Sequence, residues 1–151
     1  TIDRAAADAN VLVYANLPAN LHHADSPALL QSAERGDVEL VVFPQVVSEF
    51  IATVTNRKRV ATLRTTVEAI DAIREVLTTP GFVTLPPLGH TVDTFLSVLE
   101  AHPVVGQKIF DRQLVAVMRD HGVGTIYTYN LADFAGIPGV VAVRPPPAPV
   151  P

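Results

Sequence analysis

The chain has 151 residues, of which 48% are hydrophobic and 17% are charged. This composition is typical of one compact globular domain and excludes an intrinsically disordered protein. The absence of cysteine excludes disulfides, a thiolate zinc site and a cysteine nucleophile, and the formal net charge of −4 argues against binding of nucleic acid by bulk electrostatics.

The pattern of apolar and polar residues predicts alternating strands and helices. The expected strands lie at residues 5–8, 38–43, 81–85, 125–129 and 140–143. The expected helices lie at residues 24–36, 45–59, 62–77, 91–100 and 106–121. Such alternation predicts an α/β fold of three layers, in which helices cover both faces of a central, mostly parallel sheet of four to five strands.

Two of these segments have the clearest signals. Residues 38–43 are apolar except for Glu39 and are followed by Pro44, which is typical of a buried strand. Residues 106–121 carry apolar side chains at helical spacing, including Ile109, Leu114 and Val117. By contrast, Ala5, Ala6 and Ala7 are poor strand formers, so the first strand is the weakest prediction.

The last residues of the chain differ in composition from the rest. Residues 144–151 are proline-rich, so we expect a flexible, extended tail after a domain that spans residues 1–143.

The first residues lack the layout of a signal peptide, and no apolar run approaches the roughly 18 residues of a membrane-spanning helix. We therefore expect a cytoplasmic protein that has no membrane partner.

Four acids stand in or beside strongly apolar stretches, where a carboxylate is costly to bury unless a positive charge compensates it. They are Asp8, Glu49, Asp111 and Asp133. Asp8 and residues 130–133 follow predicted strands, and ligands of α/β sheets gather at the carboxyl ends of strands. Taken singly, each acid also fits a structural role, since Asp often occupies turns or caps helices and Glu favours a helix start.

Four short motifs containing these acids occur in a familiar order. They read DANVLVYA at residues 8–15, SEF at 48–50, DRQLVA at 111–116 and TYNLADF at 128–134. As an ordered set they resemble the PIN domain, and within it the VapC toxin ribonucleases of bacterial type II toxin–antitoxin pairs. The resemblance implies the three-layer fold named above and a metal-dependent endoribonuclease.

The resemblance also implies a Mg²⁺ or Mn²⁺ site with catalytic and metal-binding roles for Asp8, Glu49, Asp111 and Asp133. Hard divalent cations prefer oxygen ligands of this kind. Asp8 and Asp111 would bind the metal directly, Glu49 would orient or deprotonate the attacking water, and Asp133 would bind a second metal or a coordinated water. Asn130, which stands where many family members have an acid, would be an auxiliary polar group together with Asn10 and Thr128.

Basic residues supply candidate contacts to RNA phosphates. Lys108 and Arg112 flank Asp111, and Arg57, Lys58 and Arg59 form the densest basic stretch. The stretch equally fits a solvated helix end. Adjacent residues on a helix or loop point apart, so we interpret His22 and His23 as surface residues rather than as a metal pair.

The expected partners are an RNA substrate, a cognate antitoxin and a second copy of the chain in a homodimer. The mean hydropathy of +0.30 predicts an exposed apolar patch on the helices spanning residues 45–77 that serves such an interface. Two other hypotheses remain. Asn130 and the weak first strand suit a catalytically silent PIN-like binding module, and an acid at a strand end suits a receiver-type signalling domain. A receiver would need a late Lys outside a helix, whereas the last Lys is Lys108.

Overall fold

The computed structural model describes residues 3–17 and 24–149. Within these residues the strands are β1 (Asp3–Ala7), β2 (Val38–Val41), β3 (Phe82–Val83), β4 (Thr125–Tyr127) and β5 (Val141–Val143). The helices are α1 (Ala9–Ala15), α2 (Asp25–Glu34), α3 (Pro44–Val54), α4 (Thr66–Thr78), α5 (Thr91–Ala101), α6 (Lys108–Asp120) and the short 3₁₀ helix η1 (Leu131–Phe134). No helix in these two stretches of chain is long and apolar enough to cross a membrane.

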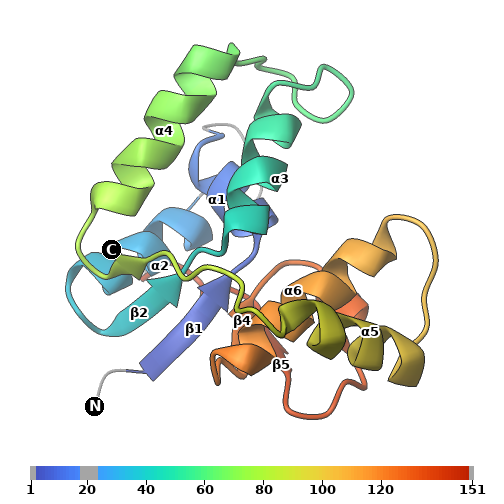
Figure 1. Ribbon diagram of the computed structural model, residues 1–151. Helices are drawn as coiled ribbons and strands as arrows, with labels where there is room; N and C mark the ends of the chain where they lie inside the picture. The colour runs from blue at the N-terminus through green and yellow to red at the C-terminus, as the bar shows by residue number, and fades with distance from the viewer. Residues whose placement is uncertain (1–2, 18–23, 150–151) are drawn as a thin grey trace.

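The five strands form one sheet in the order β3-β2-β1-β4-β5, and every neighbouring pair is parallel. The chain builds the sheet outward from β1 to β3, and then crosses back to place β4 on the other side of β1 (Figure 1). The carboxyl ends of β1 and β4 therefore meet at a topological switch point, where α/β sheets bind their ligands.

Two hydrophobic clusters occupy the two faces of the sheet. One contains Ala5, Leu40 and residues of α2 such as Leu29, and the other contains Ala6, Val41 and residues of α3, α4, α5 and α6. Neighbouring strand residues thus point to opposite faces, as a buried strand requires. The three-layer α/β fold predicted from the sequence is confirmed.

The run of three alanines forms the centre of the sheet despite its low strand propensity. Ala6 and Ala7 are fully buried, and Ala6 pairs with Val41 on one side and Ile126 on the other. Small side chains allow helices to pack closely on a central parallel strand, so packing overrides intrinsic propensity here.

Several predicted boundaries were wrong. The first strand covers Asp3–Ala7 instead of residues 5–8, and Asp8 begins helix α1, which the sequence analysis missed. Helix α3 ends at Val54 instead of residue 59. Helix α4 begins at Thr66 because Thr65 and Glu68 form a reciprocal capping box, with bonds of 2.9 and 3.1 Å.

The proline-rich segment runs extended beside α2 as far as it is described. Pro145 is buried, and the backbone N–H of Ala148 donates to Oδ1 of Asp25 over 3.0 Å. The guanidinium of Arg144 lies 5.9 Å from the ring centre of Tyr129. These contacts hold the start of the segment against the domain, and its mobility in solution stays a prediction.

Candidate active site

The candidate site is built on Asp8, which follows β1 and caps α1. Its Oδ1 accepts the N–H of Ala9 over 2.8 Å, and its backbone N–H donates to the carbonyl of Tyr127 at the end of β4. Only 6% of the Asp8 residue surface is exposed. A carboxylate at this position is fixed by both central strands of the sheet.

Thr128 and Asn10 complete the support of this carboxylate. The buried Thr128 hydroxyl donates to Oδ2 of Asp8 over 2.8 Å, and accepts from Nδ2 of Asn10 and from the N–H of Asn130 over 3.2 and 3.0 Å. A hydroxyl has one donor and two acceptor positions, so all three are used. Nδ2 of Asn10 also lies 3.4 Å from Oδ2 of Asp8. Two of the three predicted auxiliary residues, Thr128 and Asn10, thus position Asp8.

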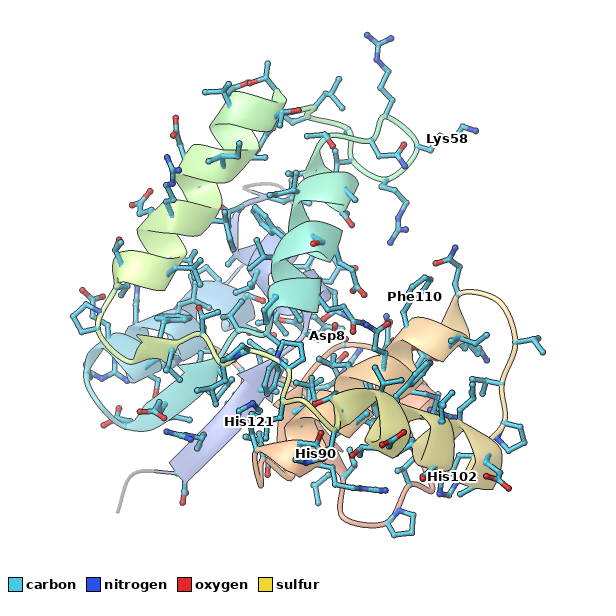
Figure 2. All side chains as sticks on the ribbon, viewed as in Figure 1. Asp8, Lys58, His90, His102, Phe110 and His121 are labelled. Carbon is cyan, nitrogen blue, oxygen red and sulfur yellow. The ribbon has the colours of Figure 1, made fainter. Side chains whose placement is uncertain are left out.

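A polar hollow of about 300 Å³ opens beside Asp8. The acids Glu49 of α3 and Asp111 of α6 line it together with Asp8. The labelled Asp8 lies where the ends of α3 and α6 approach each other (Figure 2). The fold therefore gathers three of the four predicted acids, which are separated by up to about a hundred residues of sequence, around one hollow. Asn130 also lines it.

Asp111 has the most perturbed carboxyl group of the set. Burial and the nearby charges of Asp133, Asp8 and Glu49 raise its pKa to about 7, against a smaller opposing effect of Arg112. Burial also raises the pKa of Asp8, while the hydrogen bond from Thr128 lowers it and the charges of Glu49 and Asp133 add to the increase. The repulsion extends over all four acids, so Asp133 is close to the others although it does not line the hollow.

In the described part of the chain, no basic side chain forms a direct ion pair with this cluster. The salt bridges among residues 3–17 and 24–149 join Arg4 to Glu39, Arg35 to Asp37 and His90 to Asp120. These lie outside the acid cluster. The fold holds the carboxylates together, and the charge of Arg112 offsets only part of their mutual repulsion; a divalent cation would relieve the remainder.

The side chains of the cluster nevertheless do not surround a single metal position. No group of three or more His, Asp or Glu side chains in the described part of the chain is arranged to hold a metal ion. Mg²⁺ commonly binds through one or two carboxylates and keeps several waters. The oxygen-rich hollow with Asp8 and Asp111 at its wall therefore fits a hydrated Mg²⁺ or Mn²⁺ ion.

The five basic residues predicted to contact phosphate lie in different surroundings. Arg59 lines the polar hollow, whereas Arg57 and Lys58 are exposed in the loop after α3 and Lys108 is exposed at the start of α6. Figure 2 shows Lys58 in that loop, which projects from the end of α3. Arg112 instead contacts the protein, donating to the carbonyls of His102 and Asp133 over 3.0 and 2.8 Å. His22 and His23 lie outside the described residues.

One further residue of the site was not predicted from the sequence: Gln45, whose amide donates to Oε1 of Glu49 over 3.1 Å. Its position four residues before Glu49 on a predicted helix was the available signal, since such residues are neighbours on a helix surface. Thr53, four residues after Glu49, lines the polar hollow and had the same signal.

An apolar hollow of about 700 Å³ lies beyond this site, between the start of α3 and helices α5 and α6. The large apolar side chains exposed within the described part of residues 45–77 are Leu63 and Val67. Leu88, Val92 and Phe110, which line the apolar hollow, are also exposed. Exposed large apolar side chains therefore occur both within residues 45–77 and around the apolar hollow, and the interface predicted on the helices of residues 45–77 stays a prediction.

Solved structures share the fold of this chain. VapC20, a Sarcin–Ricin loop cleaving toxin of Mycobacterium tuberculosis, superposes with a TM-score of 0.68 at 18% identity over 93% of this chain and 98% of that chain. The chain has the fold of the VapC toxins. VapBC2 from Rickettsia felis, bound to a DNA fragment from its promoter, gives a TM-score of 0.67 at 14% identity over 93% and 98% of the two chains.

A toxin–antitoxin complex from Klebsiella pneumoniae gives a TM-score of 0.63 at 18% identity, over 95% of this chain and 98% of that chain. No protein-family profile matches the sequence, and no curated protein matches it. The VapC fold is thus evident in the structure, while the sequence has diverged far from these proteins. This agrees with the PIN-like architecture that the four short motifs predicted.

Proposed function

We propose that the chain is a divalent-metal-dependent endoribonuclease that acts in the cytoplasm as the toxin of a toxin–antitoxin pair. The observation that carries this proposal is the cluster of Asp8, Glu49, Asp111 and Asp133 at the switch point of the sheet, which no salt bridge of the described residues joins to a basic side chain. The likeness to a VapC toxin that cleaves the Sarcin–Ricin loop supports RNA as the substrate class.

The cofactor proposed is Mg²⁺ or Mn²⁺, held by Asp8 and Asp111. When bound, the cation supplies positive charge that offsets the carboxylates and polarises a phosphoryl oxygen. The net charge of −4 therefore does not argue against RNA, because two divalent cations would bring the loaded protein close to neutrality.

Three residues of the chain would have separate roles in the reaction. Asp8 is immobilised by Thr128, so it offers its oxygens in one fixed direction. Glu49 lines the hollow, where it would orient a water molecule and accept its proton. Arg59 lines the same hollow and would contact a phosphate of the substrate.

The test is incubation of the purified protein with total RNA and Mn²⁺, with the cut ends mapped, beside an Asp8→Ala variant. We expect discrete cleavage sites from the wild type and none from the variant. Equal cleavage by Asp8→Ala would show that the nuclease activity comes from elsewhere. A matched control is Asp3→Ala, since Asp3 is an exposed acid at the opposite end of β1.

A catalytically silent binding module is the second candidate, because an amide, Asn130, lines the hollow where a further acid would strengthen metal binding. Calorimetric titration with Mn²⁺ separates the two functions. An endoribonuclease should bind Mn²⁺ in the wild type and lose most of that affinity in Asp8→Ala, whereas a silent module should show no acid-dependent binding.

The fourth position of the site is either Asp133 or Asn130. Asp133 raises the pKa of Asp111 through its charge, and Asn130 lines the hollow. If Asp133 contributes its charge to the bound metal, Asp133→Asn should reduce cleavage at limiting Mn²⁺ more than Asn130→Ala does. The reverse order would assign the position to Asn130.

The proposed partners are a cognate antitoxin and a second copy of the chain. Two neighbours in the fold are solved as a VapBC protein and a toxin–antitoxin complex. The exposed apolar side chains Leu88, Val92 and Phe110 offer a contact surface, and a specific interface should bury more than about 1,000 Å². Light scattering of the protein at micromolar concentration, alone and with the product of the neighbouring gene, tests both partners.

A further inference from the structure

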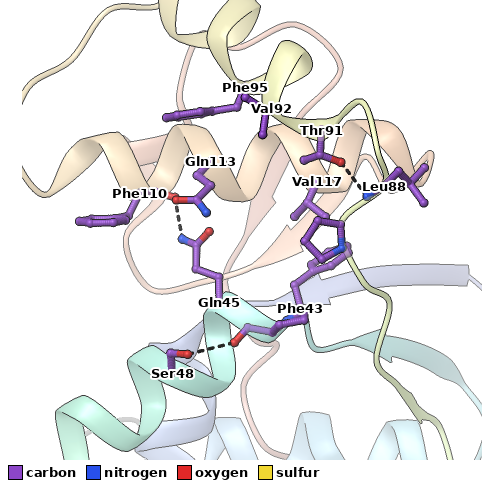
Figure 3. Close-up of a pocket in the computed structure, with 12 residues that line it drawn as sticks. Phe43, Gln45, Ser48, Leu88, Thr91, Val92, Phe95, Phe110, Gln113 and Val117 are labelled. Atoms are coloured by element: carbon purple, nitrogen blue, oxygen red, sulfur yellow. Dashed lines mark hydrogen bonds between the residues drawn. The ribbon is translucent and has the colours of Figure 1, made fainter.

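Gln45 connects the two helices that carry Glu49 and Asp111. Its Nε2 atom lies 3.1 Å from Oε1 of Glu49 on the next turn of α3, and 2.7 Å from the carbonyl oxygen of Phe110 on α6. A primary amide has two N–H donors, so both hydrogen bonds can form at once. Figure 3 shows Gln45 reaching across from α3 to Phe110 at the edge of the apolar hollow.

The second bond matters because Phe110 immediately precedes Asp111. Helix α3 packs mainly against α1 and α4, whereas α6 packs mainly against α5. Both helices contribute to the same hydrophobic core, and the Gln45 amide adds a direct polar link between their first turns. A side chain that spans the gap sets where the Glu49 carboxylate lies relative to Asp111.

Glu49 depends on this support. Within the described residues, Gln45 is the hydrogen-bond donor that reaches the Glu49 carboxylate. Glu49 is only half-buried, and a long side chain at such a position is otherwise free to change rotamer. A donor on the preceding turn restricts that freedom, and a hydrogen bond to a charged acceptor is stronger than one between neutral groups.

We infer that Gln45 is a positioning residue for the reaction: it holds the Glu49 carboxylate in register with Asp111 across the gap between α3 and α6. This inference rests on the proposed function, in which Glu49 orients the water that attacks RNA. Gln45 contacts neither Asp8 nor Asp111 by a hydrogen bond in the described structure, so it acts through Glu49.

The test replaces Gln45 by Met, which keeps the length of the side chain and loses both donors. At saturating Mn²⁺ we expect kcat for cleavage of an RNA oligonucleotide to fall about 10-fold to 100-fold, the range that misplacement of a reacting group produces. KM and the thermal midpoint should stay close to wild type, because Gln45 lies at the rim of the hollow and not in the core.

Ser48→Ala is the matched control. Ser48 lies on the same helix and lines the same apolar hollow, but its hydroxyl contacts the carbonyl of Pro44 over 3.4 Å within α3. All three parameters should remain unchanged in this variant. A Gln45→Met protein that keeps its wild-type kcat would overturn the inference. A Gln45→Met protein with a lower kcat, a changed KM and a lower thermal midpoint would also overturn it, because that result would show a role in folding alone.

Crystal structures of the wild type and Gln45→Met supply a readout independent of activity. We expect the Glu49 carboxylate to move from its wild-type position while the backbones of α3 and α6 stay in place. If Glu49 does not move, Gln45 does not position it. A wild-type protein that fails to cleave RNA would refute the proposed function, and the structural comparison alone would then decide the role of Gln45.

Discussion

Asp8 and Thr128 are separated by 120 positions in the chain, yet the Thr128 hydroxyl donates to Oδ2 of Asp8 over 2.8 Å in a buried setting. The bond forms because parallel pairing of β1 with β4 brings the two carboxyl ends together. It ties the position of the candidate metal ligand to the topology of the sheet, so a change at Thr128 should affect the site and the fold together.

Thr128→Val removes this donor with little change in shape. We expect a loss of about 1–3 kcal/mol in the free energy of unfolding, because Asn10 and the N–H of Asn130 lose their acceptor as well. The pKa of Asp8 should rise further, since the Thr128 bond lowers it more than the backbone bond from Ala9 does. Mn²⁺ affinity at neutral pH should therefore fall, because a ligand must be deprotonated to bind.

Urea denaturation and calorimetric Mn²⁺ titration measure the two effects. Thr128→Ser keeps the hydroxyl and should preserve most of the stability and the metal affinity. If Thr128→Ser is as damaging as Thr128→Val, the methyl group of Thr128 contributes more than its hydroxyl, and the bond to Asp8 is not what fixes the site.

A second prediction concerns the pH dependence of stability. The folded pKa of Asp111 is raised to about 7 from an ordinary value of 3.8, so between these two values the folded state binds more protons than the unfolded state. The contribution of Asp111 to stability is therefore favourable at low pH and is lost as pH rises towards about 7. In the metal-free protein, Asp111→Asn should remove this component and be more stable than the wild type above pH 7.

Thermal unfolding in the presence of a chelator, at several pH values between 5 and 8, checks this expectation through the difference between the two proteins. Titrating groups that do not interact with Asp111 cancel in that difference. Addition of Mn²⁺ should reverse the order, because a cation that binds only the folded wild type stabilises it. A difference between the two proteins that does not change with pH would contradict the raised pKa.

The sequence predicted the acid cluster better than it predicted the contacts that hold the cluster. Asp8, Glu49 and Asp111 could be chosen because each is an acid in an apolar context within an ordered motif. Arg112 shows the limit of that reasoning. Its place beside Asp111 suggested a phosphate contact, but its hydrogen bonds go to the carbonyls of His102 and Asp133, which only the folded chain brings within reach.

Helix α1 shows the same limit for the fold. Residues 11–15 are an apolar run, and periodicity cannot distinguish a buried helix from a buried strand in so short a run. The deciding feature is Asp8, whose side chain accepts the N–H of Ala9 and begins the helix. Long helices such as α6 were predicted well because one side faces solvent and the alternation is visible in the sequence.

The two basic residues beside Asp111 should respond differently to substitution. Arg112→Met removes the bonds to His102 and Asp133, so we expect η1 to loosen, with a loss of about 1–3 kcal/mol in unfolding free energy. Lys108 is exposed, and Lys108→Met should leave stability within about 0.5 kcal/mol. If Lys108 contacts phosphate, its loss should raise KM for RNA. Equal stability of the two variants would show that the Arg112 bonds contribute little.

The last prediction tests how closely β3 approaches α2, and it uses two glycines with similar backbone angles. Gly81 has φ of +91° and Gly36 has φ of +87°. Alanine at either position must adopt a left-handed conformation, which costs about 1–3 kcal/mol. A Cβ atom on Gly81 would also lie 2.0 Å from the carbonyl oxygen of Ala33, whereas one on Gly36 would meet nothing within 4 Å.

Gly81→Ala should therefore be clearly less stable than Gly36→Ala in urea denaturation, because the backbone of α2 must move to relieve the clash. The Gly81 carbonyl accepts the N–H of Leu40 over 2.9 Å, so movement at Gly81 also weakens the pairing of β3 with β2. Circular dichroism should show that both variants still fold. If the two variants are destabilised equally, Gly81 and Ala33 must lie farther apart in solution, so that a Cβ atom at Gly81 does not clash with the carbonyl oxygen of Ala33.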